Sequence, residues 1–99
     1  MTEIERLKKA ILDLHSLDST HVASVPINET FEGKPVWQGV VEIFAVLNHP
    51  IARRAYAWSY KNDEGKARYV AILGIPPVKT ALDAVRAYVL AEIKKQTKL

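Results

Sequence analysis

Cysteine is absent from this chain of 99 residues, so disulfide bonds and thiolate chemistry are excluded. Apolar runs are short, and none approaches the roughly 20 residues that a membrane-spanning helix needs. The opening stretch from Met1 to Arg6 is acidic and amphipathic, unlike the basic and then apolar order of a signal peptide. From these absences we expect a cytoplasmic protein with no contact to a membrane.

Motifs that carry chemistry are equally scarce. No glycine-rich phosphate loop follows a predicted strand, and no serine lies in a nucleophile elbow. His15, Asp18 and His21 straddle a predicted helix end, and no closely spaced set of histidine or cysteine supports a metal site there. We therefore predict no catalytic residue, no metal and no cofactor, and the sequence favours a non-enzymatic protein over an enzyme.

The charge balance is mild. Fourteen lysine and arginine residues against 11 acidic ones give a formal net charge of +3, which permits a polyanionic partner without requiring one. A chain of 99 residues, 48% apolar and 25% charged, is typical of one folded domain with one core. We predict a single domain that spans residues 1–99.

Two helices are predicted, one near each end of the chain. The first runs from about Glu3 to Leu17, where Thr2 and Glu5 have the spacing of a capping box. The second follows Pro76 and Pro77, because a proline at the first helical position loses no needed donor. The apolar stripes comprise Ile4, Leu7, Ile11 and Leu14 in the first helix, and Val78, Leu82, Val85 and Val89 in the second.

Between the helices, apolar and aromatic residues alternate with a period of two, which predicts an antiparallel meander of strands. A fourth strand is predicted between Thr20 and Phe31, at the sheet edge because Pro26 cannot donate to a neighbour; the alternative is an extended loop. The three other strands are Trp37 to Leu47, Ala52 to Lys61 and Ala67 to Leu73.

Two turns set the register. Asn62 to Gly65 predicts a four-residue hairpin loop in which Trp58 faces Tyr69. Around Asn48-His49-Pro50, a four-residue loop sets Ile43 opposite Tyr56, whereas a five-residue loop slips the register by one and exchanges the faces. We favour the four-residue loop because Gly39 then lies opposite Tyr60 and leaves room for its ring.

Both faces of this sheet are apolar, which predicts an α+β fold: a two-layer, antiparallel sheet of three to four strands with N- and C-terminal helices packed on it. We expect both helices to cover the aliphatic face, so that the aromatic face meets a second copy of the chain. The alternative places one helix on each face and hides both within a monomer. The aromatic face presents Trp37, Val41, Ile43, Tyr56, Trp58, Tyr60, Tyr69 and Leu73; the aliphatic face presents Val40, Phe44, Val46, Ala55, Ala57, Val70 and Ile72, with Glu42 as its main polar member.

The leading functional hypothesis is therefore a small interaction or regulatory domain that forms a homodimer through a sheet face. A second hypothesis is binding of RNA or single-stranded nucleic acid, whose bases often stack on sheet aromatics beside basic groups. A third is a small enzyme or ligand-binding protein that uses Glu42, a carboxylate on an apolar face. The candidate interaction surface comprises Trp37, Arg54, Tyr56, Trp58, Tyr60 and Tyr69.

The order of elements, helix then strands then helix, resembles that of double-stranded-RNA-binding domains. The basic start of that family's last helix is absent, since the matching stretch reads Pro77-Val78-Lys79-Thr80-Ala81. The resemblance implies a topology and carries no functional residue to this chain.

Overall fold

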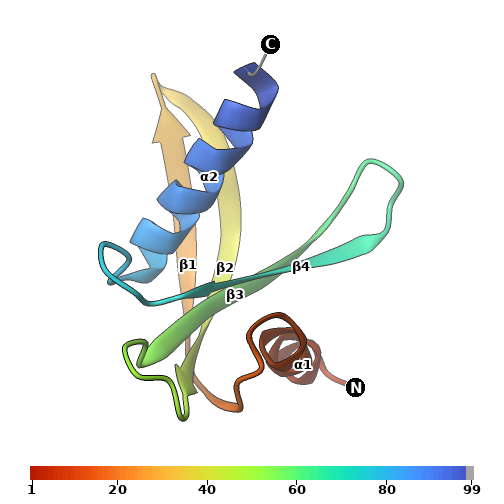
Figure 1. The fold of residues 1–99 in the computed structure, drawn as a ribbon. Helices are drawn as coiled ribbons and strands as arrows, with labels where there is room; N and C mark the ends of the chain where they lie inside the picture. Colours follow the sequence, from red (N-terminus) through yellow and green to blue (C-terminus); the bar gives the residue numbers. More distant parts are fainter. Residues whose placement is uncertain (98–99) are drawn as a thin grey trace.

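The computed structural model describes residues 1–97, in which one helix precedes and one helix follows the four strands of an antiparallel sheet (Figure 1). The strands lie in the order β1-β2-β3-β4. The predicted α+β architecture is confirmed, and so is the strand at the edge that contains Pro26. The elements are α1 (Glu3–His15), β1 (Ser19–Phe31), β2 (Lys34–Val46), β3 (Arg54–Lys61), β4 (Ala67–Leu73) and α2 (Ala81–Thr97).

Helix α1 begins and ends at capping residues that the sequence contains. The backbone N–H of Glu5 donates to the hydroxyl of Thr2 over 3.1 Å, which satisfies a free donor of the first turn. Ser16 adopts a left-handed conformation (φ 57°) and its N–H donates to the carbonyl of Leu12. This cap ends the helix before Leu17, the predicted last residue.

Helix α2 begins later than predicted. The hydroxyl of Thr80 accepts from the N–H of Asp83 over 3.1 Å, so Thr80 is the residue that caps the first turn. The carboxylate of Asp83 accepts in turn from the N–H of Lys79. Pro76 and Pro77 therefore lie in the connection before the helix, and the prediction of a proline at the first helical position was wrong.

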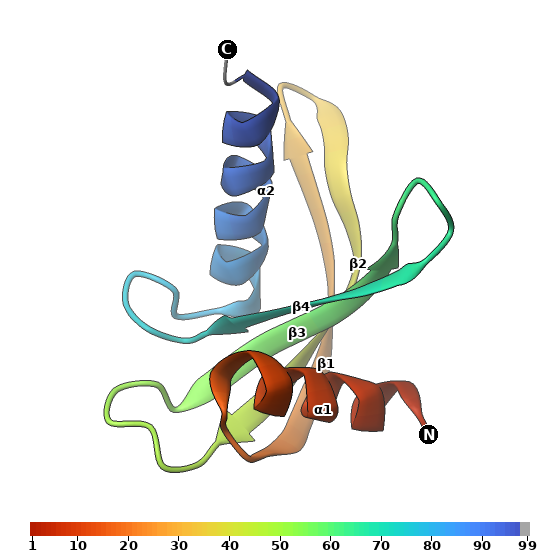
Figure 2. The same cartoon turned by 45° about the vertical axis from the view of Figure 1, so that its right-hand side comes forward.

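Strands β1 and β2 form a long hairpin with a two-residue turn. Glu32 and Gly33 both have positive φ, 52° and 79°, and Phe31 pairs with Lys34 across the turn. Such turns match the right-handed twist of the flanking strands. The turn reaches the same end of the molecule as the C-terminal end of α2 (Figures 1 and 2).

The two hairpins share only a short stretch of pairing. Residues Glu42 to Ala45 of β2 pair with Arg54 to Ala57 of β3, which confirms the predicted partnership of Ile43 with Tyr56. The reason given for that register was wrong, because the pairing ends before Gly39. A Cβ at Gly39 would lie 3.1 Å from Cη2 of Trp37, so the glycine accommodates the ring of Trp37 and not that of Tyr60.

The register of the second hairpin also differs from the prediction. Trp58 pairs with Val70, one residue away from the expected Tyr69. The side chain of Asn62 accepts from the backbone N–H of Lys66, which extends the turn by one residue. The slip exchanges the two faces of β4: Val70 packs on the Trp58 side and Tyr69 on the opposite side.

The helices cover opposite faces of the sheet, so the expectation that they share the aliphatic face was wrong. In Figure 2, α1 lies beside β3 and β4 and also contacts β1, whereas α2 runs along β1 and β2. Helix α2 fits the aromatic face because its small residues, Ala81 and Ala84, allow the helix to lie close to Tyr56 and Trp58. The core beneath α1 contains Leu7, Ile11, Leu17, Phe44, Val46, Ala52, Ala55 and Ala57; the core beneath α2 contains Val41, Ile43, Tyr56, Trp58, Ala81, Ala84 and Val85.

In residues 1–97, no helix combines the length and the apolar character needed to cross a bilayer.

Candidate functional site

The aromatic surface predicted from the sequence is mostly core. Trp58 is 3% exposed and Tyr56 is 2% exposed, because α2 covers both. The hydroxyl of Tyr56 donates to the carbonyl of Lys79, just before α2, over 2.9 Å. Burial raises the pKa of Tyr56, and the nearby charge of Arg54 partly opposes this rise. Neither ring is available to a partner or to a stacking base.

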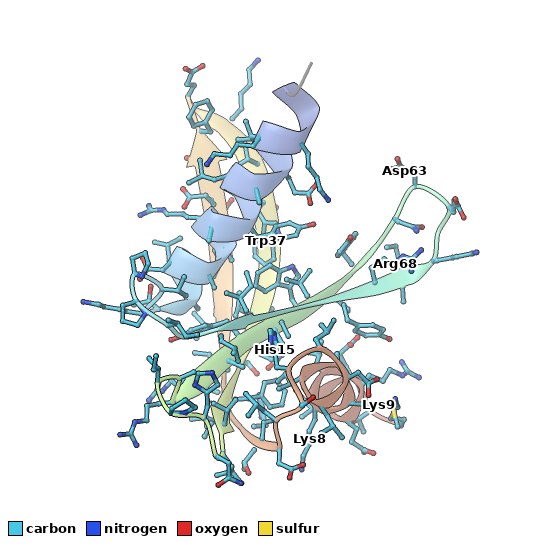
Figure 3. The ribbon with its side chains drawn as sticks, viewed as in Figure 1. Lys8, Lys9, His15, Trp37, Asp63 and Arg68 are labelled. Carbon is cyan, nitrogen blue, oxygen red and sulfur yellow. The ribbon has the colours of Figure 1, made fainter. Side chains whose placement is uncertain are left out.

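Trp58 is the centre of an aromatic cluster. Its ring meets Trp37 edge to face at 5.2 Å between centroids, and it meets Tyr88 of α2 in the same way at 5.5 Å. Tyr60, 42% exposed, lies 6.4 Å from Tyr88. In Figure 3, Trp37 lies between α2 and the second hairpin. Side chains of this cluster therefore pack α2 against the sheet.

Two details of this cluster bear on its chemistry. The indole N–H of Trp58 is buried and has no hydrogen-bond acceptor within residues 1–97. Burial, with smaller effects of Tyr60 and Glu92, raises the pKa of Tyr88 to about 12. The helix stripe gives no sign of the role of Tyr88, since its aromatic partners, Trp58 and Tyr60, come from β3.

The other two predicted residues lie elsewhere. Tyr69 packs against the core beneath α1, on the opposite side of the sheet from Trp58. Arg54 lies at the start of β3, beside the N-terminal end of α2. The structure therefore brings Trp37, Trp58 and Tyr60 together and separates Tyr69 from them. Helix α2 thus covers Tyr56 and Trp58, two of the rings that were expected to stack on bases.

Glu42 has two polar partners that the alternation did not reveal. Its Oε1 lies 2.9 Å from Nε2 of His21 and accepts from the hydroxyl of Ser24. A bulge causes this arrangement: His21 pairs with Phe44 and Ala23 with Ile43, so Val22 is an extra residue in β1. The bulge turns His21 to the face that carries Ser24 and Glu42.

In this cluster, His21 and Ser24 are not arranged as a general base and the nucleophile that it activates. Among the described residues, no hydrogen bond joins the imidazole of His21 to the hydroxyl of Ser24, because both groups contact the same carboxylate oxygen. The side chain of Glu42 is 15% exposed, so little of it faces solvent. The arrangement satisfies a mostly buried carboxylate on β2, an inner strand of the sheet.

The histidines do not form a metal site. Nε2 of His15 lies 2.8 Å from the carbonyl oxygen of Ala71, and the side chain points from α1 toward β4 (Figure 3). His21 instead contacts Glu42 on β2. Throughout residues 1–97, no three histidine, cysteine or acidic residues are grouped so that they could hold a metal ion.

An apolar hollow lies between the turn end of the first hairpin and the C-terminal half of α2; we call it the tip groove. Its volume is about 270 Å³. Phe31 and Leu90 at its rim are 58% and 57% exposed, and Val36 is 38% exposed. Its polar wall is an ion pair, in which Nε of Arg86 lies 2.6 Å from Oε2 of Glu29. The lining comprises Glu29, Thr30, Phe31, Val36, Arg86, Val89, Leu90 and Ile93.

A second hollow, of about 320 Å³, lies at the opposite end of α2; we call it the Arg54 pocket. Two cationic residues, Arg54 and Lys79, line it beside the buried ring of Tyr56. The lining comprises Val25, Ile27, Ile43, Arg54, Tyr56, Lys79, Thr80, Ala81 and Leu82.

Comparison with known proteins identifies no relative of this chain: no family model, no curated protein and no solved structure matches it. The function is therefore argued from the surfaces just described.

Proposed function

We propose that the chain is a small non-enzymatic interaction domain that associates with a second copy of itself through the tip groove. The observation that supports this proposal is the exposure of Phe31, Val36 and Leu90 together, around one apolar hollow. Contiguous apolar surface on a folded domain commonly marks a site of protein association. The sequence analysis assigned self-association to the aromatic face, but α2 covers that face, so the proposal uses a different surface.

A second copy suits the tip groove because each chain presents both a projecting ring and a hollow. Phe31 stands at the end of β1 beside the hollow that it helps to line. In a dimer with two-fold symmetry the same patch meets itself, so the ring of each copy enters the hollow of the other. Aromatic residues and arginine, both present here, are enriched in protein interfaces.

A cytoplasmic location, expected from the sequence, stays a prediction.

Sedimentation velocity over a range from low micromolar to millimolar concentration tests the proposal. We expect the unmodified chain to shift from monomer to dimer within this range. Leu90→Glu introduces a charge into the groove, and burial of an unpaired carboxylate opposes association. This variant should remain monomeric at every concentration.

Leu14→Glu is the matched control. Leu14 is 59% exposed on α1, close to the 57% exposure of Leu90, but it does not line the groove. The control variant should dimerise like the unmodified chain. A monomer at millimolar concentration for the unmodified chain, or equal effects of the two substitutions, would refute self-association through this surface.

A further inference from the structure

The Arg54 pocket combines an apolar floor with a cationic rim. Its floor includes Ile43 and Ala81, each 7% exposed, and the aliphatic chains of Val25, Ile27 and Leu82 complete the walls. Its volume of about 320 Å³ lies at the small end of the roughly 300–1,000 Å³ found for ligand pockets. A pocket of this size and polarity suits a small molecule with an apolar body.

The charge at the rim has one sign. No acidic side chain lines the pocket, and within residues 1–97 the structure gives neither Arg54 nor Lys79 an ion pair. Asp83 is the nearest carboxylate along the chain, but it accepts from the backbone N–H of Lys79 over 3.0 Å. That hydrogen bond, more than any other interaction, lowers the pKa of Asp83, so the carboxylate stays ionised; it acts on Tyr56 from outside the lining of the pocket.

Two hydroxyl groups also line the pocket, and that of Thr80 accepts from the backbone N–H of Asp83. The hydroxyl of Tyr56 donates its proton to the carbonyl of Lys79 and is therefore not free to donate to a ligand. The first turn of α2 begins beside the pocket at Thr80, and the positive end of the helix dipole adds to the attraction for an anion. The unpaired charge available for recognition is that of the two cationic side chains.

We propose that the Arg54 pocket binds a small carboxylic acid anion with an apolar body, such as a medium-chain fatty acid. The planar guanidinium of Arg54 has the donor geometry for two parallel hydrogen bonds to a carboxylate. Lys79 adds a second positive charge, and the apolar body contacts Ile43 and Leu82. Binding is non-covalent and requires no metal or cofactor.

Isothermal titration of the full chain with octanoate, and with octanol as its neutral counterpart, tests this proposal. Octanoate should bind one to one. Octanol should bind at least about tenfold more weakly than octanoate, because it lacks the charge that pairs with Arg54. Arg54→Gln should weaken octanoate binding by about tenfold or more, and Lys79→Gln should weaken it to a smaller extent.

Arg53→Gln is the matched control, because Arg53 is the exposed neighbour of Arg54 and does not line the pocket. It removes the same charge and should leave octanoate binding unchanged. Far-UV circular dichroism checks that each variant is folded. Amide chemical shifts locate the ligand: they should move at Ile43 and Ala81 and stay fixed at Leu90, in the tip groove.

Three results would overturn the proposal: no saturable octanoate binding, equal binding of octanol, or equal effects of Arg54→Gln and Arg53→Gln. Shifts confined to the tip groove would overturn it as well. None of these outcomes bears on self-association, which sedimentation measures without a ligand.

Discussion

Replacement of Trp58 by alanine tests the packing of α2 on the aromatic face. The indole is 3% exposed and contacts Trp37 and Tyr88 edge to face. Truncation of a buried tryptophan to alanine costs about 3–5 kcal/mol, because apolar contacts are lost and a cavity remains. A domain of this size unfolds with a free energy of about 5–15 kcal/mol, so the variant should lose a large fraction of its stability.

Trp58→Phe separates two contributions to this loss. Phenylalanine leaves a smaller cavity than alanine, and it also removes the buried N–H that has no acceptor within residues 1–97. An unsatisfied buried donor costs about 1–3 kcal/mol, so its removal offsets part of the lost packing. We expect Trp58→Phe to lose less than half of what Trp58→Ala loses.

Urea denaturation followed by far-UV circular dichroism measures both variants, since fluorescence would lose one of its two tryptophan reporters. Tyr60→Ala is the comparison within the same cluster. Its side chain is 42% exposed, so its loss should stay near or below about 1 kcal/mol. If Trp58→Ala lowered the stability by less than about 1 kcal/mol, the ring would not lie beneath α2 and the described packing would be wrong.

Two further predictions concern single residues. Tyr88 should ionise at a pKa of about 12 in the folded chain against an ordinary value of 10.0, as ultraviolet absorbance at high pH would record. Because the pKa is raised on folding, its stabilising effect is complete below pH 10.0 and is lost as the pH rises through about 12; Tyr88→Phe should reduce this dependence, and the part that remains belongs to Tyr56, whose pKa burial also raises. Glu32→Asn should raise the free energy of unfolding by about 0.5 kcal/mol, because asparagine tolerates the positive φ of 52° better than glutamate. Thermal denaturation measures this change, and a loss of stability would contradict the turn geometry.

The sequence predicts the elements well because their signals are local. The capping pair Thr2 and Glu5 marks the start of α1, and the alternation of apolar residues marks the strands. Pro26 indicates an edge strand because it lacks a donor, and the structure confirms this. The register of the second hairpin depends instead on which backbone groups bond to the side chain of Asn62, and residue types at the turn do not determine that.

The candidate sites are less predictable because they depend on contacts between distant segments. A period of two assumes a regular strand, so it cannot reveal that the extra residue Val22 turns His21 toward Glu42. The sequence analysis placed both helices on the aliphatic face, which was wrong, because two apolar faces give residue types no means of assigning each helix to a face. The position of the tip groove depends on which face α2 covers, because the groove forms where α2 runs beside the turn end of the first hairpin.

The tip groove exists because α2 is longer than the stretch of sheet that the two hairpins share. Helix α2 has 17 residues and is therefore about 25 Å long at 1.5 Å per residue, whereas the stretch shared by the two hairpins contains only four paired residues in β2. The C-terminal half of the helix thus passes beyond the shared sheet and meets the first hairpin alone. There the packing does not require apolar side chains at positions 31, 36 and 90, each of which remains at least 38% exposed. Burial in the core explains Trp58 and Val85, but it does not explain Phe31 and Leu90. The proposed association accounts for these apolar residues, and it requires that Leu90→Glu alter association while leaving the stability of the monomer nearly unchanged.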